Sequence, residues 1–190
     1  MYQTLHNKLS TQDIQYHLAS ASANYQIEST TVGLQYGYNY IYLDNKSLNA
    51  AHMLTPSLGI FLSPKLYSHL TYEYHDKKSF RDKNENAKVN AGGFMQYFYL
   101  SDTYKSWLNI GYKYNDENAV NNQYDFAENI FTAGGQIPLF EKLIFTPAVN
   151  YTEKEFKEDY TGQTVKRKDR ITNLNAALAR EIVKNHICPK

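Results

Sequence analysis

The sequence predicts an all-β protein, an antiparallel up-and-down meander of about nine strands that forms part of a transmembrane β-barrel. Three observations predict this fold: apolar residues recur at every second position, short turns alternate with longer polar connections, and tyrosines gather where strands approach the longer connections. A period of two is that of a strand, whose successive side chains point to opposite faces. No segment shows the 3.6-residue period of an amphipathic helix.

The clearest strand is TTVGLQYGYNYIYL, in which Val32, Leu34 and Tyr36 begin a run of apolar residues at every second position that continues to Tyr42. A less regular strand over residues 12–25 precedes it. The same alternation predicts the remaining strands over residues 54–62, 66–74, 89–99, 104–114, 131–139, 143–151 and 174–182. Pro56 and Pro147 interrupt two of these strands, and each is expected to mark a bulge or a strand end.

The connections between the predicted strands differ in length. Short turns are expected at residues 28–30, 63–65, 101–103 and 140–142, and longer loops at LDNKSLNAA, HDKKSFRDKNEN, NDENAVNNQYD and residues 153–170. In a meander this alternation places every short turn at one end of the sheet and every long loop at the other. Transmembrane barrels have this arrangement, with short turns on one side of the membrane and long loops on the other.

The alternation also assigns a face to each side chain. Apolar side chains expected to face lipid are Val32, Leu34, Leu58, Ile60, Leu70, Leu108, Ile110, Phe145, Val149, Leu174 and Leu178. Tyrosines expected to form a girdle at the membrane interface, because a phenol has an apolar ring and a polar tip, are Tyr40, Tyr42, Tyr72, Tyr74, Tyr112, Tyr114 and Tyr151. A second girdle is expected near the short turns from Phe61, Tyr67, Tyr97, Tyr99, Tyr104 and Phe140.

The opposite faces are predicted to line the lumen. They carry Glu73, Lys88, Asn90, Gln96, Lys105, Lys113, Asn109, Glu128, Gln136 and Glu181, while Val89, Ala91, Gly93, Met95, Tyr97 and Tyr99 are assigned to the outward face of their strand. In the charged stretch after Tyr151, a hairpin would set the acidic residues 153–159 against the basic residues 166–170.

Composition excludes several other classes of protein. The chain has 190 residues, enough for one domain, and its 20 basic and 19 acidic residues give a net charge of +1, which argues against a nucleic-acid partner. Cys188 is the only cysteine, so the chain cannot form an internal disulfide or a thiolate metal site. The mean hydropathy of −0.61 does not argue against a barrel, because barrel strands alternate polar and apolar residues. The first thirty residues lack the apolar core of a secretory signal.

No catalytic, cofactor or metal site is predicted. His69, Glu73 and His75 share one strand face, but residues four apart in a strand are separated by about 13 Å, too far to bind one ion. An approach of His52 to His69 from the neighbouring strand would be needed to leave metal binding open.

Three stretches resemble a known family: LNIGYKYNDENAVNNQYDFAENIFTAGGQIPL, TPAVNYTEKEF and RITNLNAALAREIVKNH. They resemble the C-terminal outer-membrane β-barrel that follows tetratricopeptide repeats in Gram-negative bacteria, as in the surface lipoprotein assembly modifiers. The resemblance covers roughly residues 30–186, and it implies the bacterial outer membrane and passage of a lipoprotein or polysaccharide to the cell surface. The chain departs from this family in lacking a preceding repeat domain, a terminal strand that ends in an aromatic residue and an even number of strands. It is therefore expected to be a single, incomplete barrel domain over residues 1–190 that requires missing strands, an upstream repeat domain or another copy of itself.

The predicted function is an outer-membrane export, translocation or porin-like channel, in contact with outer-membrane lipid, without enzymatic activity and without a cofactor. Two alternatives remain at this point. The first is a soluble, lipocalin-like ligand-binding barrel, and the second is a small outer-membrane enzyme with a nucleophile and a base clustered in the lumen.

Overall fold

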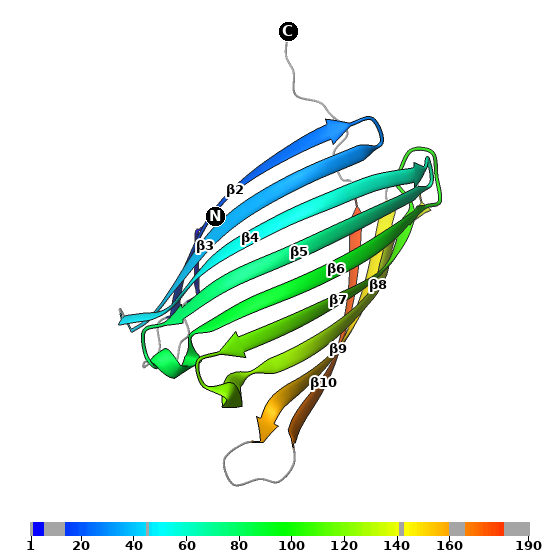
Figure 1. Cartoon of the computed structure of the whole chain (residues 1–190). Helices are drawn as coiled ribbons and strands as arrows, with labels where there is room; N and C mark the ends of the chain where they lie inside the picture. Colours follow the sequence, from blue (N-terminus) through cyan, green and yellow to red (C-terminus); the bar gives the residue numbers. More distant parts are fainter. Residues whose placement is uncertain (1, 6–13, 45, 141–142, 160–165, 181–190) are drawn as a thin grey trace.

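The computed structural model describes residues 2–5, 14–44, 46–140, 143–159 and 166–180. The described strands form one antiparallel sheet in which each strand pairs with its neighbours in sequence (Figure 1). They are β1 (Tyr2–Leu5), β2 (Ile14–Ile27), β3 (Thr30–Leu43), β4 (Lys46–Ser63), β5 (Leu66–Ser79), β6 (Ala87–Tyr99), β7 (Trp107–Ala119), β8 (Phe126–Phe140), β9 (Leu143–Asp159) and β10 (Lys166–Arg180). The all-β meander is confirmed, and the short β1 is a strand that the sequence did not predict.

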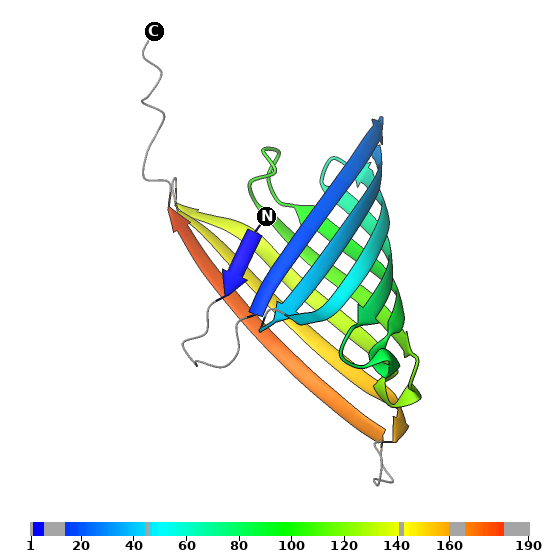
Figure 2. The same ribbon diagram turned by 90° about the vertical axis from the view of Figure 1, so that its left-hand side faces the viewer.

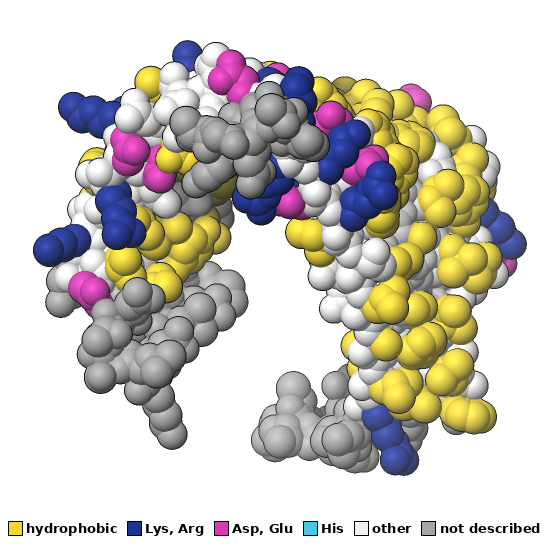
Figure 3. All heavy atoms as spheres, turned by 90° about the horizontal axis from the view of Figure 1, so that it is seen from below, with side chains coloured by type: hydrophobic (Ala, Val, Ile, Leu, Met, Phe, Trp, Pro, Cys, Tyr) yellow, Lys and Arg dark blue, Asp and Glu magenta, His cyan; other side chains and the backbone are white. Residues whose placement is uncertain are grey.

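The sheet curves into an open trough, with β1 and β10 facing each other across its mouth (Figure 2). Seen from below, it surrounds a hollow that is open on one side (Figure 3). Within the described residues, β1 pairs only with β2 and β10 only with β9, so the sheet is not closed. The described helical segments are two single 3₁₀ turns, η1 (Lys83–Glu85) and η2 (Asn122–Tyr124), and neither has the length or the apolar character required to cross a membrane.

The strands are longer than the sequence predicted. Most of the polar stretches predicted as long loops are continuations of paired strands, and between β3 and β4 only residues 44 and 45 connect the two. The strict alternation of short and long connections is therefore wrong: residues 80–86 and 100–106, at opposite ends of the sheet, each connect their strands by seven residues. Polar side chains do not end a strand when both arms of a hairpin extend together, because the backbone groups stay paired while the side chains contact water.

The two prolines lie inside strands and not at strand ends. Pro56 pairs with Leu34 of β3, whereas the pairing of β4 with β5 is interrupted between Leu54 and Ser57. Likewise Pro147 pairs with Ala176 of β10, whereas β9 has no partner on β8 at this position. Each proline keeps one neighbouring strand and interrupts the ladder to the other, as expected for a residue without a backbone N–H.

Strand register defines the two faces of the sheet. One row of directly opposed residues crosses seven strands: Val32, Leu58, Leu70, Phe94, Tyr112, Phe131 and Tyr151. This row lies on the convex face, where hydrophobic side chains gather in Figure 3. Residues at the intervening positions point into the trough.

Register corrects the face assigned to β6. Val89, Ala91 and Met95 oppose His75, Glu73 and His69, and they therefore lie on the concave face together with Gly93, Tyr97 and Tyr99. Lys88, Asn90 and Gln96, predicted to face the lumen, lie on the convex face with Phe94 and Phe98. The alternation was misleading here because β6 has apolar or small residues on both faces over residues 91–99, and its polar residue Gln96 shares the face of Phe94 and Phe98, so only its pairing with β5 and β7 decides its orientation.

Candidate functional site

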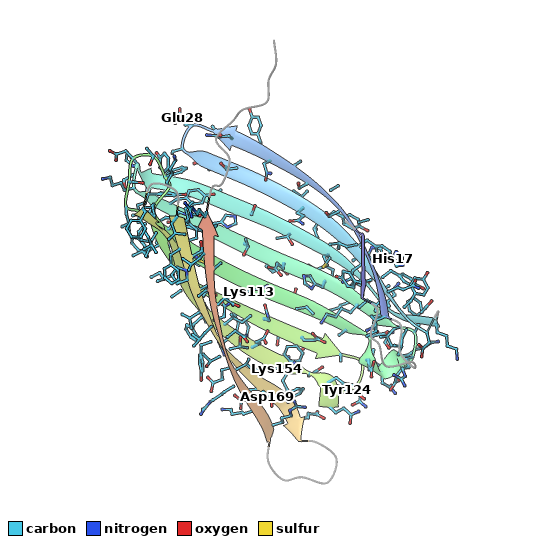
Figure 4. All side chains as sticks on the ribbon, turned by 180° about the vertical axis from the view of Figure 1, so that it is seen from behind. His17, Glu28, Lys113, Tyr124, Lys154 and Asp169 are labelled. Carbon is cyan, nitrogen blue, oxygen red and sulfur yellow. The ribbon has the colours of Figure 1, made fainter. Side chains whose placement is uncertain are left out.

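Two ion pairs cross the concave face from β5 to β7, passing over β6. Lys113 Nζ lies 2.8 Å from both carboxylate oxygens of Glu73, and Lys77 Nζ lies 2.5 Å from Glu117 Oε2. Two strands separated by one other strand lie about 10 Å apart. A lysine bridges that distance only if the side chains of the strand between them are small. The concave residues of β6 that leave this space are Ala87, Val89, Ala91 and Gly93. Figure 4 shows Lys113 on this concave side.

The residues singled out for a metal site are separated by the fold. His69, Glu73 and His75 do share the concave face, and His75 Nε2 lies 3.4 Å from Glu73 Oε2. His52 lies on the convex face, where its Nδ1 is 2.7 Å from Tyr36 Oη, so His52 does not approach His69. The part of the chain that the structure describes contains no group of three or more His, Cys, Asp or Glu side chains placed to hold a metal ion.

A cavity of about 390 Å³ opens on the concave face near the ends of the strands that carry η1 and η2. Its polar groups include Lys77, Glu117 and Lys154, and Lys154 Nζ lies 3.4 Å from the ring centroid of Phe126 and 5.0 Å from that of Phe156. Burial lowers the pKa of Lys154, three residues beyond Tyr151. The cavity therefore combines cations, a carboxylate and aromatic faces, which suit a polar solute better than an apolar one.

An aromatic cluster occupies the concave face at the opposite end, near the short turns. Tyr67 is its centre: its ring centroid lies 4.7 Å from that of Phe61 and 5.9 Å from that of Tyr97. Tyr99 packs edge-on against Tyr104 at 4.8 Å. The predicted second girdle is thus wrong for Phe61, Tyr67, Tyr97 and Tyr99, which point into the trough, whereas Phe140 opposes Leu143 on the convex side. These residues were assigned to the wrong face because the position of an aromatic residue along a strand does not reveal which face of the sheet it occupies when the strand register is unknown.

The predicted lipid-facing and girdle residues all lie on the convex face. Leu174, Leu178, Ile110, Leu34 and Val32 are the most exposed of the lipid-facing set, at 77%, 66%, 54%, 51% and 48%. The other lipid-facing residues are Leu58, Ile60, Leu70, Leu108, Phe145 and Val149, and the girdle residues are Tyr40, Tyr42, Tyr72, Tyr74, Tyr112, Tyr114 and Tyr151. A water-soluble sheet would bury so continuous an apolar face under a second layer.

The girdle tyrosines are staggered from strand to strand, in the sense that a common strand tilt brings them closer to one height. Relative to the row from Val32 to Tyr151, the tyrosine pair of β3 lies eight and ten residues further along its strand, the pair of β5 two and four, and Tyr112 of β7 is in the row itself. From β3 to β9 the mean shift is about 1.5 residues per strand, which at about 3.3 Å per residue and 4.8 Å between strands corresponds to a tilt of about 45°. Transmembrane barrels tilt by about 35–45°, so the mean stagger agrees with such a tilt, but the stagger is uneven: it is about three residues per strand from β3 to β5 and about half a residue per strand from β7 to β9.

Beyond the girdle, the same strands carry charged residues on both faces. The predicted hairpin pairing is confirmed on its convex side, where Lys168 lies 3.1 Å from Glu155 and Arg170 lies 3.2 Å from Glu153. Tyr160 to Gly162 at its tip lie outside the described residues. Next to this hairpin, Lys157 Nζ lies 2.6 Å from Asp116 Oδ1. Its hydrogen bond holds the pKa of Asp116 below the ordinary value, helped by a second hydrogen bond from Asn118.

The comparisons with known proteins identify a fold. No family model and no curated protein matches the chain. Two solved structures match it, both barrels from Vibrio cholerae. One, described as "Outer-membrane expressed OmpT of Vibrio cholerae", has a TM-score of 0.61 and 12% identity over 85% of this chain. The other, described as "OmpT (in-vitro folded), an outer membrane protein of Vibrio cholerae", has a TM-score of 0.60 and 10% identity over 91% of this chain.

The chain has an outer-membrane β-barrel fold. It spans 54% and 60% of the lengths of the two barrels it matches. These two matches do not confirm the resemblance to the repeat-linked assembly modifiers, and membership of that family stays a prediction.

One functional prediction requires correction. The chain was expected to have no enzymatic activity, with a small outer-membrane enzyme as an alternative. That expectation does not stand, because both matching barrels are OmpT proteins, and a shared barrel fold at 10–12% identity gives no ground for excluding catalysis. Residues that sequence reasoning missed, above all Lys77, Lys154 and the small side chains of β6, come together only through register across three or more strands.

Proposed function

We propose that the chain forms part of the wall of a water-filled, porin-like passage through the bacterial outer membrane. The observation that carries this proposal is the difference between the two faces of β5 at one height. Tyr72 and Tyr74 point outward and Glu73, between them, points into the trough, where it pairs with Lys113. The Lys113 and Glu73 side chains are 32% and 22% exposed. Partly exposed charges at membrane depth require water on their side of the sheet.

The soluble alternative fits these faces poorly. A lipocalin-like barrel binds an apolar ligand inside and contacts water outside, which is the reverse of the distribution seen here. The concave side carries the β5–β7 ion pairs and the cavity with Lys154, whereas the convex side exposes Val32, Leu70 and Ile110. This distribution supports contact of the convex face with outer-membrane lipid.

We further propose that additional strands close the passage. Two open sheet edges in lipid would leave backbone N–H and C=O groups without partners, which costs several kcal/mol per group. The length of the matched barrels supports this proposal, since the chain spans 54–60% of them. The missing strands, an upstream repeat domain and a second copy of the chain all stay predictions, as do the single domain over residues 1–190 and a lipoprotein or polysaccharide cargo.

The test is conductance across a planar lipid bilayer after the detergent-refolded protein is added. A water-filled passage gives discrete current steps, and Lys113→Met should shift its ion preference toward cations because Glu73 then lacks its counter-charge. Lys88→Met, which removes a lysine from the convex face, is the matched control and should leave the preference unchanged. Absence of current from protein that has inserted, or an equal shift in both variants, would overturn the proposal.

A further inference from the structure

A second cavity lies at the ends of β3, β4 and β5, immediately beyond the girdle, and residues of both faces line it: Ser47 opposes the girdle residue Tyr42, whereas Lys46 opposes Leu43 on the concave face. Its volume is about 460 Å³, and it lies between the β3–β4 turn and the segment that follows β5. Lys46 and Arg81 line it together with Phe80, Ser47 and Asp44. The backbone joins its two sides, because Phe80 N donates to Leu48 O at 2.9 Å. The cavity is therefore built by two neighbouring strand ends and not by a single loop.

The floor of this cavity is continuous with the tyrosine girdle. The ring of Phe80, 53% exposed, lies 5.5 Å from that of Tyr40, and the Tyr40 hydroxyl donates to Ser47 Oγ. Tyr40 and Phe80 thus place the floor of the cavity next to the band expected to contact headgroups. A lipid molecule could lay its chains along the convex face while its headgroup reaches Lys46 and Arg81.

Among the described residues, no ion pair neutralises the cations of this cavity. Among the residues that the structure describes, Lys46, Arg81 and the neighbouring Lys78 make none of the ion pairs found. The nearby carboxylates have other roles: Asp82 accepts the N–H of Asn84, and the Glu85 carboxylate interacts with the Ser79 hydroxyl. Asp44 also lines the cavity and is engaged in a contact of its own, and Asp76 opposes Lys88 across the β5–β6 ladder.

Other cations at this end of the sheet do have carboxylate partners. On the convex side of β7, β9 and β10, Lys157, Lys168 and Arg170 are each paired with a carboxylate. From β4 to β6, Lys46, Lys78, Arg81, Lys83 and Lys88 make none of the ion pairs found among the described residues, and of these Lys46 and Arg81 line the cavity with the aromatic floor. Lysines that only extend their side chains to the membrane interface would need neither a cavity nor an aromatic floor.

We propose that the Lys46–Arg81 cavity binds the phosphate group of a lipid headgroup in the membrane leaflet that adjoins this end of the sheet. The planar guanidinium of Arg81 suits two phosphate oxygens at once, and the Lys46 ammonium supplies a second charge. The proposal rests on the membrane-spanning orientation proposed above, but not on conductance.

Native mass spectrometry of the detergent-refolded chain tests this proposal with phosphatidic acid as the probe and phosphatidylcholine as the comparison lipid. Because each cation near an anionic lipid surface contributes a modest attraction, the Lys46→Gln/Arg81→Gln double variant should bind phosphatidic acid about 30-fold more weakly than the unaltered chain. The matched control, Lys65→Gln/Lys105→Gln, removes the same charge at the short-turn end and should bind as the unaltered chain does.

Three outcomes would overturn the site: equal retention of both lipids, equal weakening in both double variants, or displacement of phosphatidic acid by millimolar inorganic phosphate, which would indicate a free-phosphate site. Flotation with phosphatidylcholine vesicles is measured in parallel. Failure to float contradicts the membrane orientation, whereas flotation without selective binding contradicts only the lipid site.

Discussion

Replacing Leu58 by arginine tests the assignment of the convex face to lipid. Leu58 opposes Val32 on β3 and Leu70 on β5, and it lies in the middle of the apolar run from Leu54 to Leu62. Each end of that run is four residues away, which at about 3.3 Å per residue and a tilt of about 45° is roughly 9 Å in height. Leu58 is therefore expected near the bilayer midplane, where an arginine on the lipid face costs about 2–4 kcal/mol.

The matched control is Ser57→Arg, one residue away on the same strand. Ser57 points into the trough, where it opposes Gly33 and Thr71, so an arginine there can extend into water. We expect Leu58→Arg to lower the free energy of unfolding by about 2–4 kcal/mol and Ser57→Arg by at most about 1 kcal/mol.

The assay is urea unfolding of the refolded protein in lipid vesicles, followed by fluorescence of Trp107, the only tryptophan. Heat-modifiable gel migration confirms that each variant has folded. An equal loss in the two variants, or a larger loss for Ser57→Arg, would refute the assignment of the two faces.

Three further predictions concern packing and charge. A double-mutant cycle on Lys113→Met and Glu73→Gln should give a coupling energy of about 0.5–1 kcal/mol by urea unfolding, since both side chains are partly exposed, and a coupling of zero would contradict the bridge over β6. Gly59→Ala should lose about 1–2 kcal/mol, because its new Cβ would collide with the Tyr67 phenol ring and hydroxyl, and Tyr67→Ala should relieve most of that loss; additive losses would contradict the contact. Asp116, whose pKa its lysine partner lowers, should contribute stability that is present above its unfolded pKa of about 3.9 and is lost as pH falls through the lower folded value. Asp116→Asn should therefore flatten the acid limb of the stability curve, and an unchanged limb would contradict this contribution.

The sequence predicted the faces well where apolar and polar residues alternate cleanly. In β3, β5 and β7 one face alternates Leu, Ile, Val and Tyr with polar or small residues, and the structure places those apolar residues on one side. In β6 the polar residues Lys88, Asn90 and Gln96 lie on the convex face, so the alternation indicated the wrong face and the predicted orientation was inverted. The orientation of β6 follows from its neighbours, because each backbone hydrogen-bond ladder fixes which residues oppose each other.

Strand ends were predicted less well than strand centres. His75, Asp76 and Lys77 were predicted as part of a loop, yet they continue β5 because Val89, Lys88 and Ala87 of β6 pair with them. Polarity marks where side chains meet water, and in this sheet the strands continue past that point. The concave ion pairs were also beyond sequence reasoning, since their partners are 40 residues apart and meet only over a third strand.

A nitroxide scan of β6 in lipid vesicles tests the central claim most directly, namely that the convex face contacts lipid and the concave face contacts water. Single cysteines are placed at residues 91–98 in a Cys188→Ser background, and the accessibility of each label to oxygen and to a water-soluble nickel complex is measured. We predict maximal oxygen accessibility at Gly92, Phe94 and Phe98, and maximal nickel accessibility at Ala91 and Gly93. The opposite phase, or accessibility without a period of two, would contradict the account.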